Sequence, residues 1–436
     1  MVKILHLAVH MGGGVGKAIS GVCIGSRKKY HTDIVLLEKP NDYFFVNQAR
    51  DSGISVYVLP DSDQLEKLIY LADIVVINWW GHPLMIRFLQ NFPPKACRCI
   101  IWNHVNGCTY PYLPAEFLLQ FSGIMFTTPY SYSNNMWSEY ERECIAQLSD
   151  VVYGMGNFTP SEIKAKSNYL HGKKFVIGYL GTIDYAKINR NFLDYYEEVI
   201  KRIPDIKVCM LGHVSDEIQK EITVRNLGAY FELPGYVENI EDYIYQFDVF
   251  AYLLTPENYA TTENALLEAM AYGIPIMVLD NELEKHIIKN NVNGYVVSDV
   301  NEFREKIAFL HDVQNAERIG RSAREFVINE YSADKNVARY DAICQAALLG
   351  HKKIYAFTDI LGSDGYEAFA YFSQTAGNII TEMVRNNSSG VLEKINPIFY
   401  SANKGSLYQY FRYYPDDERL RKMVDFFRRN GKGDYK

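Results

Sequence analysis

The chain has 436 residues, 48% of them hydrophobic and 22% charged, and a formal net charge of −7 at pH 7. This length exceeds one ordinary hydrophobic core and predicts two domains with an appendage. The acidic balance argues against a dedicated nucleic-acid-binding protein, and the sequence lacks the apolar run of about 18 residues that a membrane-spanning helix needs.

The seven cysteines are scattered along the chain, and none forms the Cys-x2-Cys pair that is typical of zinc sites. Cys97 and Cys99 are separated by one residue and lie at the start of a predicted strand, which makes a zinc site improbable. The first residues, MVKILHLAV, are predicted to form a strand and lack the features of a signal peptide. We therefore expect reduced thiols, no metal site and a cytoplasmic protein.

Short apolar segments alternate with helical segments over residues 1–166, and this alternation predicts a parallel, doubly wound sheet. The helices expected between the strands include residues 16–26 and 63–71, although Gly21 and Gly25 weaken the first of these predictions. The predicted strands are residues 3–8, 33–37, 55–59, 73–78, 99–103 and 123–127.

A glycine-rich segment with the sequence MGGGVGK follows the first predicted strand. It is not a phosphate-binding Walker loop, because Met11 and Ala18 replace the Gly and the Ser or Thr that such a loop requires. Gly12 and Gly14 match a dinucleotide-binding fingerprint, whose third Gly is replaced by Lys17. These residues leave three possibilities open: a nicotinamide or flavin site, a loop beside another ligand, and a tight turn without a ligand.

Several predicted strands of the first half end in polar or aromatic residues. Ligands of open α/β sheets bind beyond the carboxyl ends of the strands, so His104, in the sequence WNHVNG, is predicted to face a ligand crevice. The alternative is a histidine that is hydrogen-bonded within its loop. His10 is a weaker candidate, and Glu38 stands at the distance of a ribose-binding carboxylate. Trp79 and Trp80 either stack on a sugar or lie in the core.

The alternation of strands and helices starts again at residue 175 and predicts a second Rossmann-like domain. We therefore expect two doubly wound α/β domains, at residues 1–166 and 174–347, followed by a helical and aromatic extension at residues 348–436. The predicted strands of the second domain are residues 175–181, 207–212, 230–233, 249–252, 276–279 and 294–297.

The segment NYATTENALLEAMAYGIP of the second domain carries the most chemical information. Thr261 or Thr262 is predicted to cap a helix whose first turn contains Glu263. Gly273 is predicted to end this helix. The free N–H groups at its entrance favour an anion such as a diphosphate. Glu268 lies between apolar neighbours and needs a hydroxyl or a cation as its partner.

This segment resembles the donor-binding motif of retaining, nucleotide-sugar-dependent glycosyltransferases of the GT-B type, in which Glu-x7-Glu precedes Ala-Met-Ala-x-Gly-x-Pro. Glu268, Gly273 and Pro275 match this motif, whereas Ala260 stands at the position of the first Glu. The resemblance implies a two-domain enzyme that transfers a hexose from a nucleoside diphosphate sugar to a hydroxyl of a glycan, a lipid-linked molecule or a protein. It implies retention of the anomeric configuration, and neither a metal nor a cofactor.

The same resemblance assigns roles to single residues. His104 is expected to contact the transferred sugar near the scissile bond, and Lys187, with Arg190, to neutralise the departing diphosphate. Glu268 would accept hydrogen bonds from the ribose, and Glu263 is expected to replace the missing first Glu. The other predicted contacts of the nucleotide sugar are Gly13, Gly14, Gly212, Val237, Thr262 and Ala265.

Each of these assignments has an alternative. The missing first Glu could be replaced by Glu257, or its loss could mean an unusual sugar or an inactive enzyme. Glu263 could serve only the helix dipole, and Lys187 and Arg190 could be solvated charges at the start of a helix. Val237 could follow an ordinary Pro-Gly turn.

The extension is predicted to contain mixed helix at residues 353–385 and a basic amphipathic helix at residues 418–429. The basic helix either packs back on the body of the protein or forms a surface for a partner or for the inner face of an anionic membrane. Competing functions are a non-catalytic binding protein on the same scaffold, a sugar-nucleotide epimerase, an inverting transferase and a nicotinamide enzyme. We expect no nucleic-acid partner.

Overall fold

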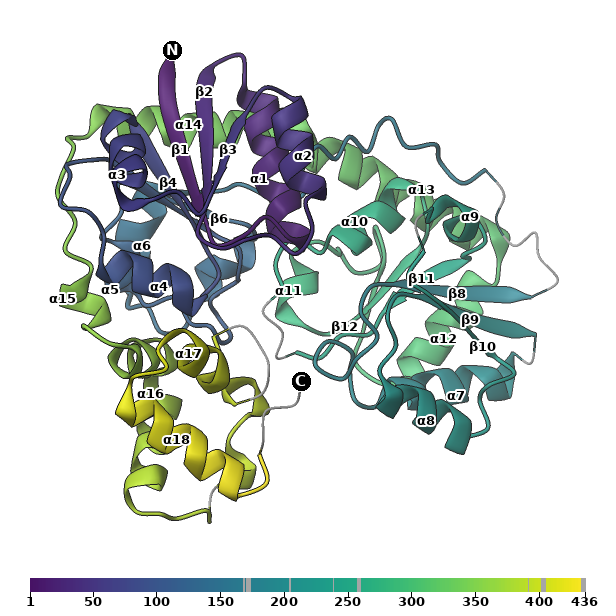
Figure 1. The fold of residues 1–436 in the computed structure, drawn as a ribbon. Coiled ribbons are helices and arrows are strands. Elements are labelled where there is room, and N and C mark those ends of the chain that lie inside the picture. Colours follow the sequence, from purple (N-terminus) through teal and green to yellow (C-terminus); the bar gives the residue numbers. More distant parts are fainter. Residues whose placement is uncertain are drawn as a thin grey trace. The chain divides into compact units, whose positions relative to one another are not determined.

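A computed structural model describes residues 1–167, 169, 174–203, 205–237, 239–256, 260–390, 392–400 and 405–432 (Figure 1). The chain forms two compact units. The first unit comprises Met1–Asn157 and Asn336–Lys436, and the second comprises Phe158–Lys335. The predicted boundaries near residues 166, 174 and 347 differ from this division, because the chain returns to the first unit at Asn336 and the extension belongs to that unit.

The first unit contains a seven-stranded parallel sheet in the order β3-β2-β1-β4-β5-β6-β7. All six predicted strands are present, and β7 is an additional short edge strand. β4 and β5 are buried along their whole length, so the core of this unit lies on the faces of its central strands. The strands are β1 (Val2–Ala8), β2 (Tyr30–Leu36), β3 (Ser55–Val58), β4 (Ile74–Trp79), β5 (Cys99–Asn103), β6 (Gly123–Phe126) and β7 (Ser149–Val151).

Helices connect these strands and cover the sheet (Figure 1). The first helix continues through Gly21, where an added Cβ would lie 2.3 Å from the backbone of Gly156. The glycine that weakened the prediction of this helix therefore allows a neighbouring loop to pack closely against it. The helices are α1 (Gly13–Ser26), α2 (Phe44–Asp51), α3 (Ser62–Leu71), α4 (Pro83–Gln90), α5 (Ala115–Leu118), α6 (Glu139–Leu148) and α14 (Ala333–Leu349).

The second unit contains a six-stranded parallel sheet in the order β10-β9-β8-β11-β12-β13. All six predicted strands are present. The strands are β8 (Phe175–Leu180), β9 (Ile206–Leu211), β10 (Phe231–Gly235), β11 (Val249–Tyr252), β12 (Ile276–Leu279) and β13 (Tyr295–Val297). The helices are α7 (Phe192–Arg202), α8 (Asp216–Val224), α9 (Glu241–Ile244), α10 (Asn264–Ala271), α11 (Glu282–Lys285), α12 (Val300–Leu310) and α13 (Val313–Glu330).

Both sheets reverse their strand order beside the first strand. In the first unit β1 lies between β2 and β4, and in the second unit β8 lies between β9 and β11. In open α/β sheets, ligands bind beyond the carboxyl ends of the strands at this switch point. The residues that follow β1 and β4 in the first unit, and those that follow β8 and β11 in the second, are therefore candidates for ligand contacts.

The extension is helical, with α15 (Thr358–Leu361), α16 (Gly365–Arg385), α17 (Leu407–Tyr413) and α18 (Glu418–Arg429). Helix α18 has the predicted bounds. It packs against α16 and α17, and α16 and α17 in turn pack against α4. The buried residues of α18 are Leu420, Met423, Val424, Phe426 and Phe427. The apolar face of this helix is thus covered by the protein itself, and its basic residues face outward.

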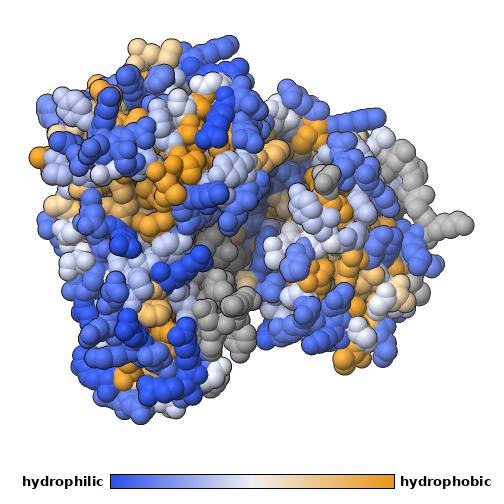
Figure 2. Space-filling model, viewed as in Figure 1, coloured by the Kyte–Doolittle hydropathy of each residue, from blue (hydrophilic) through white to orange (hydrophobic). Residues whose placement is uncertain are grey.

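The outer surface of the extension is largely hydrophilic, as the lower end of Figure 2 shows. Within the described ranges, every helix is too short or too polar to span a bilayer. Contact with a membrane through the charges of α18 stays a prediction.

Candidate functional site

The entrance of α10 differs from its predicted form. The helix begins at Asn264, and the residue at its N-cap is Glu263, whose backbone has φ 51° and ψ 58°. The prediction that Thr261 or Thr262 caps the helix is therefore wrong. A left-handed conformation costs a non-glycine residue about 1 kcal/mol or more, and such residues concentrate at functional sites. The predicted end of the helix at Gly273 is confirmed, with φ 79°.

The side chain of Glu263 makes a buried contact with Tyr252 at the end of β11. The residue is 7% exposed, and its Oε2 accepts a hydrogen bond of 2.5 Å from the Tyr252 hydroxyl. The other carboxylate oxygen, Oε1, has no hydrogen-bond partner in the described part of the chain. A buried oxygen without a partner is costly unless a ligand satisfies it. Strain and an unsatisfied oxygen thus coincide at one residue beside the switch point of the second sheet.

A second buried carboxylate lies near Glu263. Glu284, in α11, is fully buried, and neither of its oxygens makes a hydrogen bond of ordinary geometry with a described residue. Burial, and then the Glu263 carboxylate, raise the pKa of Glu284 to about 8, while the nearby Asn281 side chain and Lys187 act in the opposite direction. Glu284 was not predicted as a site residue, because its local sequence, ELEK, is also the pattern of an exposed helical turn.

Lys187 belongs to the same cluster. Its Nζ lies 5.0 Å from the centroid of the Tyr252 ring, and the Thr255 N–H donates a 2.9 Å hydrogen bond to the Lys187 carbonyl. The structure thus brings two predicted site residues to one tyrosine, with Lys187 over the ring of Tyr252 and Glu263 at its hydroxyl. We call Lys187, Tyr252, Glu263 and Glu284 the strand-end cluster.

Arg190, the other predicted cation, has different neighbours. Its guanidinium is exposed, lies 2.9 Å from Oε1 of Glu217 in α8, and covers the ring of Tyr185 at 4.6 Å. These contacts hold the Arg190 guanidinium at the surface, beside α8. Its contribution to a diphosphate site stays a prediction.

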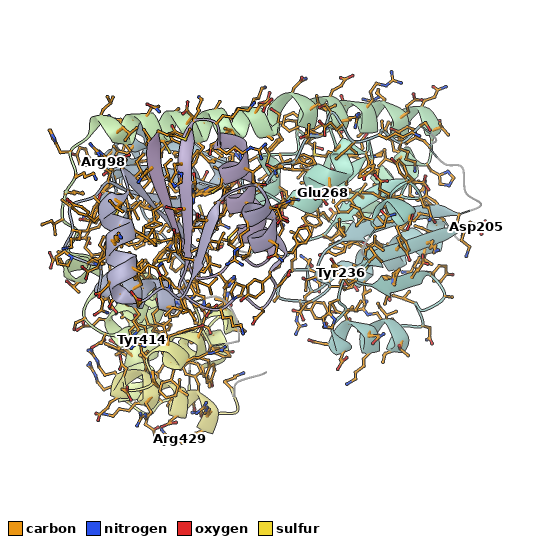
Figure 3. The ribbon with its side chains drawn as sticks, turned by 45° about the horizontal axis from the view of Figure 1, so that its top comes forward. Arg98, Asp205, Tyr236, Glu268, Tyr414 and Arg429 are labelled. Atoms are coloured by element: carbon orange, nitrogen blue, oxygen red, sulfur yellow. The ribbon has the colours of Figure 1, made fainter. Side chains whose placement is uncertain are left out.

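Glycines stand at the carboxyl ends of β8, β9 and β10, so the main chain there is not covered by side chains of its own. Gly212 has φ 141°, its N–H donates a 2.8 Å hydrogen bond to the Gly235 carbonyl, and an added Cβ would lie 1.9 Å from the oxygen of Gly181. Only glycine fits there, and the absence of side chains allows a ligand to approach the main chain. Val237 follows this turn and is partly buried. Figure 3 shows its neighbour Tyr236 at the opposite end of the sheet from Asp205.

The predicted donor contacts Ala265 and Glu268 lie in α10, and Thr262 is buried just before this helix. The first intrahelical bonds are donated by Leu266 and Leu267, so the amides of Asn264 and Ala265 lie at the open end of the helix. Glu268 is partly buried further along the same helix (Figure 3). Ala260 is also partly buried. The alternative replacement for the first Glu, residue 257, lies outside the described residues.

In the first unit, His104 is held by a chain of buried polar groups. His104 Nε2 lies 3.1 Å from Oδ1 of Asn78, which requires the proton on Nε2, and the Asn78 amide donates a 3.1 Å bond to the Leu7 carbonyl. The same amide nitrogen lies 3.4 Å from His6 Nδ1, and His6 Nε2 lies 2.9 Å from the Tyr340 hydroxyl. Burial lowers the pKa of His6 to about 3, against the effect of its Asn78 contact. The ring of His104 therefore has a fixed orientation.

Other predictions for the first unit have mixed outcomes. Trp79 and Trp80 are both buried, which agrees with the prediction that they lie in the core. Neither ring has an exposed face on which a sugar could stack. Gly13 and Gly14 are exposed, and an added Cβ at either would meet nothing within 4 Å. Helix α1 starts at Gly13 rather than at residue 16. These glycines leave open space beside the entrance of α1.

No group of three His, Cys, Asp or Glu side chains within the described ranges is placed to hold a metal ion. A cavity of about 630 Å³ in the second unit is lined by Lys166, Lys174, Val176 and Asp248. These residues lie at the amino ends of β8 and β11, the opposite edge from the strand-end cluster. The cavity is therefore separate from the predicted nucleotide-sugar site.

Residues 174–312 match the sequence family described as Glycosyl transferases group 1. No curated protein matches the chain in sequence.

Solved structures with the same fold include Anabaena HepE in complex with UDP, with 15% identity, a TM-score of 0.62, and coverage of 79% of this chain and 100% of HepE. S. aureus TarM, solved with UDP among its ligands, has 14% identity and a TM-score of 0.60 over 79% of this chain and 99% of TarM. The sucrose-phosphate synthase of Thermosynechococcus elongatus has 14% identity and a TM-score of 0.57 over 79% of this chain and 98% of its own. At these identities the likeness shows the shared fold. The chain therefore has two Rossmann-like sheets in the GT-B fold, and residues 174–312 of its second unit match the group 1 glycosyltransferase family.

Proposed function

We propose that the protein transfers a hexose from a nucleoside diphosphate sugar to an acceptor hydroxyl with retention of the anomeric configuration. The observation that carries this proposal is the strand-end cluster, in which Lys187, Tyr252 and two buried carboxylates meet beside the switch point of the second sheet. We infer UDP as the nucleotide to test first, because HepE and TarM were solved with UDP.

The residues of the cluster have complementary tasks in this reaction. The bond between the sugar C1 and the diphosphate oxygen breaks, and a bond from the acceptor oxygen to C1 forms on the same face of the sugar. The proton of the acceptor passes to the departing phosphate. Negative charge accumulates on the diphosphate, where Lys187 and the amide of Ala265 would stabilise it.

The Glu263 carboxylate and the carboxyl group of Glu284 would bind the transferred sugar. Glu263 Oε1 and both oxygens of Glu284 have no hydrogen-bond partner of ordinary geometry in the described chain, and sugar hydroxyls are suitable donors. In this proposal they take over the task of the first Glu of the motif, which is Ala260 here.

The direct test is release of nucleotide from a panel of UDP, GDP and ADP sugars, first without an acceptor and then with glycoside acceptors. We expect hydrolysis or transfer with one nucleotide class, and stabilisation against heat by the same nucleotide. Failure of every donor in both assays would refute an enzymatic function. Conversion of a free sugar nucleotide into its epimer would instead identify an epimerase.

Glu268→Ala should weaken nucleotide binding by about tenfold or more, because the mutation removes a charged acceptor of ribose hydroxyls. Isothermal titration with the nucleotide measures this effect. Glu305→Ala is a matched control, since Glu305 is exposed on α12 of the same unit. Equal affinities of the Glu268→Ala variant and the wild type would contradict the assigned role.

His104→Ala should fold and should lower kcat by about tenfold, the effect of one hydrogen bond to the transferred sugar. His31→Ala, which alters an exposed histidine of β2, serves as the control. Thermal unfolding of both variants separates a loss of activity from a loss of structure. Wild-type turnover in the His104→Ala variant would remove this residue from the site.

A further inference from the structure

Four side chains lie close together at the switch point of the first sheet. Three come from the N-terminal part of the first unit and one comes from its C-terminal extension. His10 follows β1, Glu38 follows β2, His82 follows β4, and Tyr413 is the last residue of α17 in the extension. The Tyr413 hydroxyl donates a 2.8 Å hydrogen bond to Glu38 Oε2, and Glu38 Oε1 lies 4.0 Å from His10 Nε2. The rings of His82 and Tyr413 are 4.9 Å apart. We call these four residues the rim cluster.

The two histidines of the rim cluster are oriented by the backbone. The Gly12 N–H donates a 3.1 Å hydrogen bond to His10 Nδ1, so the neutral imidazole carries its proton on Nε2, the atom that faces Glu38. The Leu84 N–H donates a 3.1 Å bond to His82 Nδ1 in the same way. The buried ring of Trp80 packs against both imidazoles, at 5.2 Å and 5.9 Å.

The extension is anchored at this place by several contacts. Arg87 donates a 3.1 Å hydrogen bond to the Tyr413 carbonyl, and the Tyr414 hydroxyl donates a 2.8 Å bond to Gln90 Oε1. The Tyr110 hydroxyl also bonds the carbonyl of Gly405. Burial, and then the contact with Glu38, raise the pKa of Tyr413 to about 12, so its hydroxyl stays a donor at neutral pH. Tyr413 is therefore held firmly and orients the Glu38 carboxylate.

The chemistry of the rim cluster indicates what it binds. The side chains of His10 and Glu38 are 34% and 31% exposed, so a ligand can reach both. A carboxylate repels phosphate, which argues against the diphosphate of the donor. An imidazole N–H beside a carboxylate offers one donor and one acceptor, and a hydroxyl group can bind both.

We propose that the rim cluster binds hydroxyl groups of a carbohydrate acceptor, with His10 and Glu38 in contact with the sugar and Tyr413 of the extension as the positioning residue for Glu38. The inference rests on the proposed function and gives the extension a task in the selection of the acceptor. Neighbouring hydroxyls of a pyranose ring suit this arrangement, because each can donate to Glu38 or accept from His10.

The test compares Glu38→Gln and Tyr413→Phe with Tyr414→Phe in the full-length protein. Tyr414→Phe is the matched control, because it removes a hydroxyl that joins the extension to α4 outside the rim cluster. The probes are p-nitrophenyl glucoside, galactoside and N-acetylglucosaminide, whose binding is measured by saturation-transfer NMR and whose KM as acceptors is measured with the active donor. The Kd of UDP is measured in the same samples.

We expect Glu38→Gln and Tyr413→Phe to raise the Kd and KM of the bound glycoside by about tenfold, and Tyr414→Phe to leave them unchanged. The Kd of UDP should not change in any variant. Equal effects of Tyr413→Phe and Tyr414→Phe, no effect of Glu38→Gln, or a wild type that binds none of the glycosides would overturn the inference. Absence of UDP binding and of donor hydrolysis in the wild type would instead refute the proposed function, and the inference with it.

Discussion

Lys187→Ala is expected to lower kcat by about 100- to 1,000-fold, which is the usual effect of removing a group that stabilises charge in a transition state. Lys187 is the cation of the strand-end cluster, and its Nζ is placed over the Tyr252 ring. The charge that it neutralises develops as the bond between the sugar and the diphosphate breaks. The loss should therefore appear mainly in kcat and only weakly in the KM of the donor.

Steady-state kinetics with the active donor check this prediction. Lys289→Ala is the control, since Lys289 is an exposed lysine of the same unit. Lys187→Arg should recover part of the activity, because it restores the charge but not the shape of the ammonium group. A rise in donor KM with an unchanged kcat would mean that Lys187 only binds the substrate.

Glu284→Gln is expected to stabilise the protein against urea at high pH. The folded state raises the pKa of Glu284 from 4.5 to about 8. Between these two values the folded protein keeps a proton that the unfolded chain has released, so stability falls as pH rises through this range. Glutamine stays neutral throughout. The free energy of unfolding of the variant should therefore exceed that of the wild type by up to about 5 kcal/mol at pH 9, since each pKa unit is worth about 1.4 kcal/mol.

At pH 4 the two proteins should have nearly equal free energies of unfolding, because Glu284 is then protonated in both states. Glu282→Gln provides a matched control on the same helix, with a side chain that is 66% exposed. Urea unfolding of the three proteins at pH 4, 6.5 and 9 measures the difference. A gap between the Glu284→Gln variant and the wild type that does not change with pH would show that Glu284 is not a strained neutral acid.

The strands and their parallel arrangement were predictable because they depend on local patterns. Buried apolar runs alternate with helices, and glycines mark the turns at residues such as Gly212 and Gly273. The motif in α10, from which the donor side is predicted, is also a local pattern. These features need no knowledge of distant contacts.

The departures from prediction depend on such contacts. Glu263 adopts a left-handed conformation while its carboxylate bonds the hydroxyl of Tyr252, and a cap rule that considers only neighbouring residues favours Thr262. Glu284 is buried by the tertiary fold although its local sequence is that of a surface helix. Tyr413 meets Glu38 across 375 residues of chain, and no spacing rule connects two positions so far apart.

That last contact bears on how the protein is made. The strands of the first sheet are complete once residue 151 has been synthesised, so this sheet can form early on the ribosome. Tyr340, which contacts His6, and Tyr413, which contacts Glu38, are translated much later. A nascent or prematurely ended chain would therefore contain the sheet but not Tyr413 of the rim cluster. In our proposal, such a chain could not select an acceptor before the extension has docked.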